Sequence, residues 1–315
     1  MMYQPTTTYA SSLLAMFTNN PNLLVSFLLF HMYVMMSFIA MASYYCIPVL
    51  MELSRHGKTR RRNGNSSTTT TTTTTNIDTD TTANSTQHHD QLDNYWTVPK
   101  SWFLHFYLFG LIMVMVMLWT MTTTRSTAIA TTTASIVLVV HLLRRCYECM
   151  YIHKFGNSRM HIMGYMVGLF HYMLLPWNFI HISITTANDN AKQQPQEAST
   201  MKVLIGLFIC IIGQYEQYQH HFILSTLRDT TRNATLHVSI PYGKWFNYVS
   251  CPHYLAEILI YIGLTIIVQT PQTEALLFWV VTNLCISAMT NHSWYLETFH
   301  EYAKLHRTAI IPFLV

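Results

Sequence analysis

Long apolar runs alternate with short polar segments through most of the chain. Seven runs predict helices, at residues 23–50, 102–121, 128–143, 162–184, 203–227, 255–268 and 275–289. Pro176 is expected to kink the fourth helix, because proline removes a backbone hydrogen bond. The last two runs are shorter than the roughly 20 residues of a simple membrane span, so we expect them to be tilted or closely packed. The pattern therefore predicts an all-α polytopic membrane protein with seven transmembrane helices.

Composition supports burial in a bilayer. Of the 315 residues, 50% are hydrophobic and only 10% are charged, whereas a soluble domain carries about 25% charged residues. So little charge cannot cover a water-facing surface, which excludes a single soluble domain. The net charge of +4 is small. Its basic residues lie in short clusters beside apolar runs, so we interpret them as topology signals and not as a nucleic-acid surface.

Three regions are expected along the chain. Residues 1–54 hold an N-terminal segment and the first transmembrane helix, and no cleavable signal peptide is expected before it. Residues 55–100 are predicted to be a disordered cytosolic loop, because their threonine-rich centre cannot form a packed core. Residues 101–315 are predicted to form a six-helix membrane core.

Basic residues predict the orientation of these helices. In a seven-helix arrangement, 15 of the 18 Lys and Arg residues fall on one side of the membrane. Basic residues concentrate on the cytoplasmic side of membrane proteins. We therefore predict a lumenal N-terminus and a cytosolic C-terminus.

The six cysteines do not indicate a metal centre. The one CxxC sequence, Cys146 to Cys149, lies in a predicted helix, and a zinc site needs a second ligand pair at suitable spacing. We expect no metal and interpret the cysteines as small buried hydrophobic residues.

His141, Arg145 and Glu148 interrupt the third apolar run at its end. Their spacing places them on one helix face. Charged groups at membrane depth are costly and are usually paired or functional. An Arg–Glu pair that holds the helix end would explain them, and so would an Arg145 that binds an anionic cofactor group beside a Glu148 that faces a substrate.

A second polar group forms a stripe on the second half of the fifth predicted helix. Gln214, Gln217, His221 and Arg228 recur at helical spacing. Amide, imidazole and guanidinium groups suit a ribose–pyrophosphate ligand, since arginine contacts phosphate through two hydrogen bonds. A solvated extension of the helix is the alternative, and spacing alone favours it.

A third group opens the sixth run. His253 and Glu257 are four residues apart on a helix that is expected to begin near Pro252, and Tyr261 lies four residues further on. An interfacial aromatic belt would explain neighbours such as Trp245. It would not explain a carboxylate inside an apolar run.

Two segments resemble a known family. The sequence IPYGKWFNYVSCPHYLAEILIY at 240–261 and the closing NHSWYLETFHEYAKLHRTAIIPFLV at 291–315 are similar to the C-terminal signature of the steroid 5α-reductase family. Upstream, VPKSWFLHFY, HLLRRCYECMYI and QYEQYQHHFILSTLR resemble the polyprenol reductase branch more than the steroid branch. The resemblance covers roughly residues 98–315. It implies a seven-helix membrane fold that binds NADPH from the cytosolic side.

The resemblance also implies a set of cofactor-binding residues. Matched by position, these are Arg145, Gln217, His221, Arg228, His253, Glu257, Tyr295 and Arg307. His292 lies beside them in the tail motif and is added to the set. The chain departs from the steroid enzymes at three of these positions, Gln217, His221 and His253. Leu142 stands where those enzymes carry a tyrosine that holds the substrate carbonyl, and no glutamate occurs in the second helix. Steroid reduction is therefore not the expected reaction.

The implied reaction saturates a C=C bond conjugated to a carbonyl. Such chemistry needs a hydrogen-bond donor for the carbonyl oxygen and a proton for the α-carbon. The candidates are Glu148, His105 and Tyr107, in that order. The implied substrate is the α-isoprene unit of polyprenol or polyprenal in dolichol synthesis, in the endoplasmic reticulum membrane and in support of N-glycosylation. A 3-oxo-Δ4-steroid reductase, a very-long-chain enoyl-CoA reductase and an inactive membrane scaffold are the alternatives.

Overall fold

A computed structural model describes residues 21–46, 96–123, 129–156, 158–176, 178, 200–227 and 239–312. These residues are mostly helical. Their α-helices are α2 (Pro21–Cys46), α5 (Phe103–Thr123), α6 (Ile129–Tyr147), α7 (Ile162–Leu174), α9 (Thr200–Thr226), α10 (Pro252–Val268) and α11 (Pro271–Thr298). Each one corresponds to one of the seven predicted runs, so the number of helices is confirmed for the described part of the chain.

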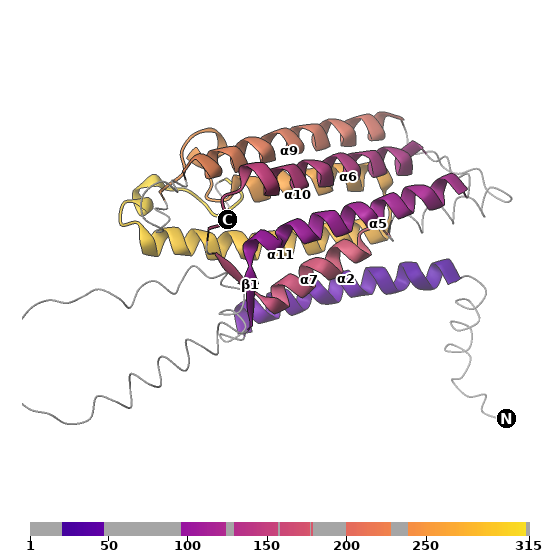
Figure 1. Cartoon of the computed structure of the whole chain (residues 1–315), viewed down its shortest axis with the longest axis horizontal. Coiled ribbons are helices and arrows are strands. Elements are labelled where there is room, and N and C mark those ends of the chain that lie inside the picture. Colours follow the sequence, from indigo (N-terminus) through magenta and orange to yellow (C-terminus); the bar gives the residue numbers. More distant parts are fainter. Residues whose placement is uncertain are drawn as a thin grey trace, which may run out of the picture.

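The helices lie side by side with roughly parallel axes (Figure 1). Helix α9 packs on α10, α2 on α11, and α5 on both α6 and α7. Four segments are long and apolar enough to cross a membrane, at 27–44, 100–123, 129–152 and 271–298, while α7 and α10 are shorter apolar helices. Seven membrane spans and their orientation therefore stay a prediction.

Helix ends follow local sequence signals. Pro252 and Pro271 occupy the first turns of α10 and α11, where the missing N–H of proline costs nothing. Thr270 forms a capping box with Thr273 at the start of α11. The prediction of one kinked helix through Pro176 is wrong, because α7 ends at Leu174 and Leu175 and Pro176 form a turn. Leu175 keeps helical dihedral angles, but Pro176 has no N–H to donate to the carbonyl of Tyr172, so the helical hydrogen-bond ladder is not continued there. Residues 179–184 lie outside the described residues.

Glycines allow α9 and α10 to approach closely. A Cβ atom at Gly206 would lie 2.6 Å from the carbonyl oxygen of Gly263, and one at Gly263 would lie 2.5 Å from that of Gly206. No side chain fits at such distances, so these backbones touch directly. This contact brings the polar second half of α9 against the start of α10.

A small sheet departs from the all-α prediction. Strand β1 (Thr97–Pro99) pairs antiparallel with β2 (Arg159–His161). The sheet joins the entry to α5 with the entry to α7. The predicted loop at 55–100 therefore has ordered residues at its end, while its threonine-rich centre lies outside the described residues.

The C-terminal segment is held against the loop that precedes α10. The backbone N–H groups of Ser250 and Cys251 donate to the carbonyls of Thr308 and Ala309, at 2.9 and 3.0 Å. The N–H of Thr308 donates in turn to Tyr248. This pairing places the tail beside the start of α10.

Candidate functional site

Polar side chains gather where α6 and α9 end and α10 begins. This polar cluster consists of Tyr107, His141, Arg144, Arg145, Glu148, His153, Gln214, Gln217, His221, His253 and Glu257. The surrounding helices leave its members buried or half-buried. Ionisable groups in such surroundings are either paired or functional.

Glu148 lies near the centre of the polar cluster, at the start of a π-helical turn, η2 (Glu148–Ile152), that continues α6. Such turns occur often at functional sites. Its carboxylate is fully buried and accepts hydrogen bonds from Nη1 of Arg144 and from Nη1 of Arg145. The ring nitrogen Nδ1 of His221 lies 2.7 Å from its Oε2. Two guanidinium groups therefore offset the charge of this carboxylate inside the bundle.

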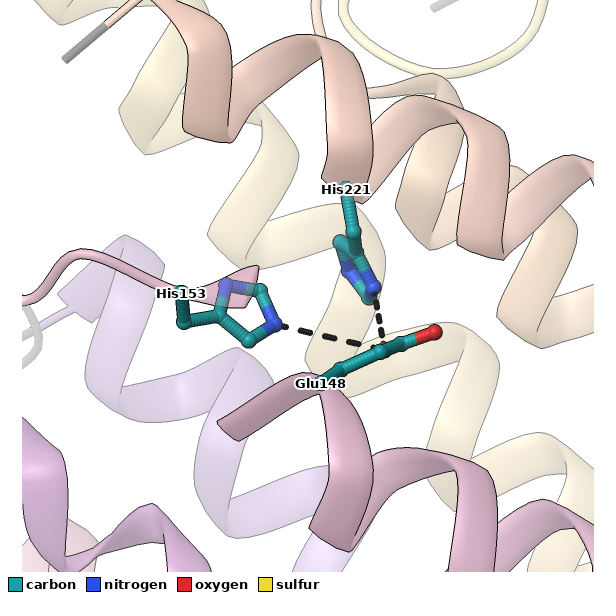
Figure 2. A group of neighbouring side chains, drawn as sticks. All are labelled: Glu148, His153 and His221. Carbon is teal, nitrogen blue, oxygen red and sulfur yellow. Dashed lines mark hydrogen bonds and ion pairs between the residues drawn. The ribbon is translucent and has the colours of Figure 1, made fainter. Parts of the chain in front are cut away.

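Glu148, His153 and His221 point toward one another (Figure 2), and their potential ligand atoms all lie within 4.8 Å. This spacing could hold a metal ion, which the sequence did not predict. However, Nη1 of Arg145 lies among the same atoms. It donates to Glu148, and it lies 2.7 Å from Nδ1 of His221 and 3.4 Å from Nε2 of His153. A guanidinium thus occupies the position of a cation, so the arrangement favours an ion-pair network over a metal centre.

Glu257 occupies the inner part of the polar cluster, on α10. Its Oε2 accepts a hydrogen bond from the amide of Gln217, and its Oε1 lies 3.4 Å from Nε2 of His141. The Gln217 carbonyl accepts from Nη2 of Arg144. Arg144 Nε also donates to Oε1 of Gln214 at 2.7 Å. A carboxylate inside an apolar run is therefore explained by partners on α6 and α9.

The predicted stripe on α9 is directed into the polar cluster and not into solvent. Gln217 and His221 are buried, and Gln214 contacts both His141 and Arg144 on α6. Arg228, the last member of the stripe, lies outside the described residues.

The two remaining catalytic candidates lie in different surroundings. Tyr107 is buried, its hydroxyl accepts from Nη2 of Arg145 at 2.6 Å, and the guanidinium carbon of Arg145 lies 4.7 Å from its ring centroid. His105 is exposed and contacts Tyr165 on α7 at 3.1 Å. The structure therefore places Tyr107 in the polar cluster and leaves His105 outside it.

A second group, the tail cluster, contains the predicted cofactor residues of the C-terminus. It consists of Tyr242, Ser250, His292, Tyr295, Tyr302 and Arg307. The Ser250 hydroxyl lies 2.6 Å from Nδ1 of His292 and accepts from the hydroxyl of Tyr302 at 2.7 Å. The ring of Tyr302 stacks on Tyr295, with centroids 4.9 Å apart. Burial raises the pKa of Tyr302 above its usual value, so this hydroxyl stays protonated and continues to donate.

Arg307 in the tail cluster is a buried cation held mainly by neutral groups. Its Nη1 donates to the carbonyl of Pro241 at 2.8 Å, and its guanidinium lies over the rings of Tyr242 and Tyr302. Its Nε is buried without a hydrogen-bond partner among the described residues, and none of their carboxylates forms an ion pair with it. Such a guanidinium has hydrogen-bonding capacity for an anion.

The tail cluster and the polar cluster are connected. His253 packs on Tyr254 with ring centroids 4.2 Å apart, and the Tyr254 hydroxyl accepts from the amide of Asn291 at 3.3 Å. Asn291 directly precedes His292 on α11. Both sets of predicted residues therefore belong to one end of the bundle.

Some members were missed by the sequence analysis. Arg144 was counted among the basic residues that set the orientation and was not placed in the site, since it lies about 100° from Arg145 around an ideal helix. The two long side chains converge on Glu148 because the chain changes to a π turn there. Ser250 and Tyr302 are joined through the pairing of the tail with the loop before α10. The residue pattern of a single segment cannot predict such a contact between two segments.

The donors present fit a phosphorylated dinucleotide. The free Nε of Arg307 suits a phosphate, and the side-chain amide nitrogen of Gln214 is also buried without a partner among the described residues. The residues that would hold such a cofactor are the amides and imidazoles of the polar cluster and the tail guanidinium of Arg307. The cations of the polar cluster are already paired with Glu148 and Gln217.

The chain is similar in sequence to several proteins named polyprenal reductases. The chain is 35% identical to a protein named polyprenal reductase 1 of Oryza sativa subsp. indica over 206 residues, which cover 57% of each chain. It is 34% identical to the polyprenal reductase of Mus musculus, over 58% of each chain. It is 35% identical to that of Homo sapiens, over 58% of this chain and 60% of the relative. The chain thus matches less than two thirds of the length of these relatives.

The match to a protein family falls on the part that carries the whole tail cluster and five of the eleven residues of the polar cluster. Residues 160–315 match the family described as 3-oxo-5-alpha-steroid 4-dehydrogenase. This range includes α7, α9, α10, α11 and the tail. The sequence resemblance and the comparisons therefore agree. Residues 160–315, which make up just under half of the chain, therefore form a domain similar to the 3-oxo-5-alpha-steroid 4-dehydrogenase family.

Proposed function

We propose that this protein is an NADPH-dependent reductase that saturates the α-isoprene double bond of polyprenal or polyprenol. The observation that carries the proposal is the buried polar network on α6, α9 and α10, in a chain whose relatives are named polyprenal reductases. Apolar helices around the network suit a long isoprenoid that lies in the bilayer. An inactive scaffold would have no need for so many buried charges.

The proposed cofactor is NADPH. When bound, its nicotinamide supplies a hydride to the β-carbon of the conjugated system. We assign its phosphates to Arg307 and to Arg228, which lies outside the described residues. We assign its remaining polar groups to Arg145, Gln217, His221, His253, Glu257, His292 and Tyr295. Arg307 supports this assignment most directly, because its buried Nε has no partner among the described residues.

The aldehyde is the better substrate on chemical grounds. A carbonyl conjugated to the double bond accepts the electrons that hydride addition displaces, whereas an allylic alcohol has no such acceptor. The protein then has to stabilise negative charge on the oxygen and supply a proton.

The surroundings of Glu148 and Tyr107 favour positioning roles for two of the three catalytic candidates. Glu148 is engaged by two guanidinium groups, and Tyr107 holds Arg145 through its hydroxyl and ring. His105 lies outside the polar cluster and contacts Tyr165. We propose that Glu148 and Tyr107 orient the arginines, and that the proton donor is a different residue.

We further propose a multi-pass protein of the endoplasmic reticulum membrane with seven spans, a lumenal N-terminus and a cytosolic C-terminus. The basic residues favour this orientation. Both clusters would then lie at the cytosolic end, where NADPH is accessible. The product would serve dolichol synthesis and thereby N-glycosylation.

A substrate panel tests the proposal. Purified protein with NADPH is given polyprenal, polyprenol and a 3-oxo-Δ4 steroid in separate reactions, and NADPH oxidation and saturated product are measured. Saturation of polyprenal with little turnover of the steroid is expected. Saturation of the steroid alone would reassign the substrate class, and failure to bind NADPH would indicate a scaffold.

A further inference from the structure

The polar cluster has an inner edge that points away from the helix ends. Along α6, His141 lies further from the end of the helix than Arg145 does, and along α10, Tyr261 lies one turn beyond Glu257. With a rise of about 1.5 Å per residue, Tyr261 lies about 6 Å deeper in the bundle than Glu257. The arginines of the polar cluster therefore lie nearer the helix ends, and the tyrosine lies deeper in the bundle.

A histidine–tyrosine pair lies at this inner edge. The Nε2 atom of His171 on α7 lies 3.3 Å from the hydroxyl of Tyr261 on α10. Tyr261 is 3% exposed, and His171 interacts electrostatically with both Glu257 and His141. The pair therefore continues the polar cluster inward.

His171 has an unused hydrogen-bonding atom. Its Nδ1 is buried and has no partner among the described residues. An unsatisfied buried polar atom costs about 1–3 kcal/mol, and folded proteins leave few of them. A purely structural contact with Tyr261 gives Nε2 a partner but leaves Nδ1 without one. A site that receives a substrate or a water molecule would give both nitrogen atoms a partner.

The chemistry of the proposed reduction requires such a neutral donor. The nearby cations are committed, since Arg144 contacts Glu148, Gln214 and Gln217, and Arg145 contacts Tyr107 and Glu148. A tyrosine hydroxyl within apolar helices offers one proton and little competition from water.

Resting on the proposed function, we propose that Tyr261 is the catalytic residue that holds the carbonyl oxygen of the unsaturated substrate, and that His171 is the positioning residue that renews its proton. In this assignment Nε2–H of His171 donates to the Tyr261 oxygen. The Tyr261 O–H is then directed to the substrate.

The electrons and protons of this step balance. When a hydride has added to the β-carbon, the two π electrons move onto the carbonyl oxygen and form an enolate. Tyr261 transfers its hydroxyl proton to that oxygen, which gives an enol, and Nε2 of His171 returns a proton to Tyr261 while Nδ1 takes one from water. The enol becomes the saturated aldehyde by moving its proton to the α-carbon. One hydride and one proton are consumed.

Three variants of the full chain test the assignment. Tyr261→Phe removes the hydroxyl, and His171→Gln keeps a hydrogen bond to Tyr261 without a proton relay. Tyr172→Phe is the matched control, because it removes one hydroxyl from a buried ring that packs against His171 with centroids 5.1 Å apart. Reduction of polyprenal, NADPH affinity and the melting temperature are measured for each variant. The ¹³C resonance of polyprenal labelled at its carbonyl carbon is recorded in complex with NADP⁺.

The expected pattern separates catalysis from folding. Tyr261→Phe lowers kcat by about 100-fold or more, as the loss of an oxyanion donor does elsewhere, with NADPH affinity close to that of the unsubstituted protein. The carbonyl resonance loses its downfield shift in this variant. His171→Gln lowers kcat by at least about tenfold, and Tyr172→Phe changes it little.

Three results would overturn the assignment, in whole or in part. A Tyr261→Phe variant that keeps kcat within twofold and retains the carbonyl shift would remove Tyr261 from the reaction, while polyprenal reduction by the unsubstituted protein would leave the proposed function intact. If the Tyr261→Phe variant does not fold, the His171→Gln variant is the test, and an unchanged kcat in that variant would overturn the proton transfer from His171 to Tyr261. Absence of reduction by the unsubstituted protein would refute the proposed function itself, and this assignment with it.

Discussion

Replacement of Glu257 by alanine tests whether the polar cluster binds the cofactor. Glu257 accepts from Gln217 and lies 3.4 Å from Nε2 of His141. Truncation leaves the Gln217 amide and the His141 ring without this acceptor. Both side chains then turn toward other partners, and the cluster is no longer arranged for NADPH before it binds.

The size of the effect follows from these two contacts. A hydrogen bond to a charged group contributes about 1.5–3 kcal/mol, and the contact with His141 is long enough to contribute less. The cluster therefore loses about 2–4 kcal/mol. If half of this loss appears in binding, NADPH binds about 5- to 30-fold more weakly, because 1.4 kcal/mol corresponds to a factor of ten.

NADPH fluorescence titration of purified Glu257→Ala measures this change. Glu257→Gln keeps the volume and one acceptor and is expected to show a smaller shift. Glu274→Ala is the matched control, because Glu274 is an exposed carboxylate at the start of α11. A folded Glu257→Ala protein with unchanged NADPH affinity would show that this carboxylate is structural and that the binding account is wrong.

Three further tests use substitutions at Arg307, Gly263 and Tyr107, the last two each with a comparison variant. Arg307→Ala is expected to weaken NADPH binding by about tenfold or more in the same titration, because a charged hydrogen bond is lost; an equal affinity would exclude Arg307 from the phosphate site. Gly263→Val is expected to lower the melting temperature in detergent, since a Cβ atom there would lie 2.5 Å from a backbone carbonyl of α9. Gly164→Ala is the control, because a Cβ atom at Gly164 has no neighbour within 4 Å, so this variant should melt near the temperature of the unsubstituted protein. Tyr107→Phe removes one acceptor of Arg145 and should raise KM for NADPH by several-fold. His105→Ala should raise it less, and the reverse order in steady-state assays would contradict the placement of Tyr107.

Much of the fold could be predicted from the sequence, because a continuous apolar run predicts a membrane helix. All seven runs correspond to helices of the described residues. The ends were harder to predict. Residues 290–298 are mostly polar, so the apolar run ends at residue 289, whereas α11 continues to Thr298. The two short strands were missed, since three residues contain too little pattern to predict a strand.

The candidate site could be predicted only in part. Contacts within one helix face, such as Arg145 with Glu148, were predictable from spacing. The convergence of α6, α9 and α10 depends on tertiary packing. Arg144 and the pairing of His171 with Tyr261 therefore could not be deduced from one segment. The separation of Tyr107 from His105 likewise follows from which side of α5 faces the bundle.

The most direct test of the central claim follows the transferred hydrogen. Purified protein is given polyprenal and NADPH that carries deuterium at its transferable position, and the product is analysed by mass spectrometry and NMR. The account predicts one deuterium at the β-carbon of a saturated α-isoprene unit. Deuterium at the carbonyl carbon, or an unlabelled and unchanged substrate, would contradict it.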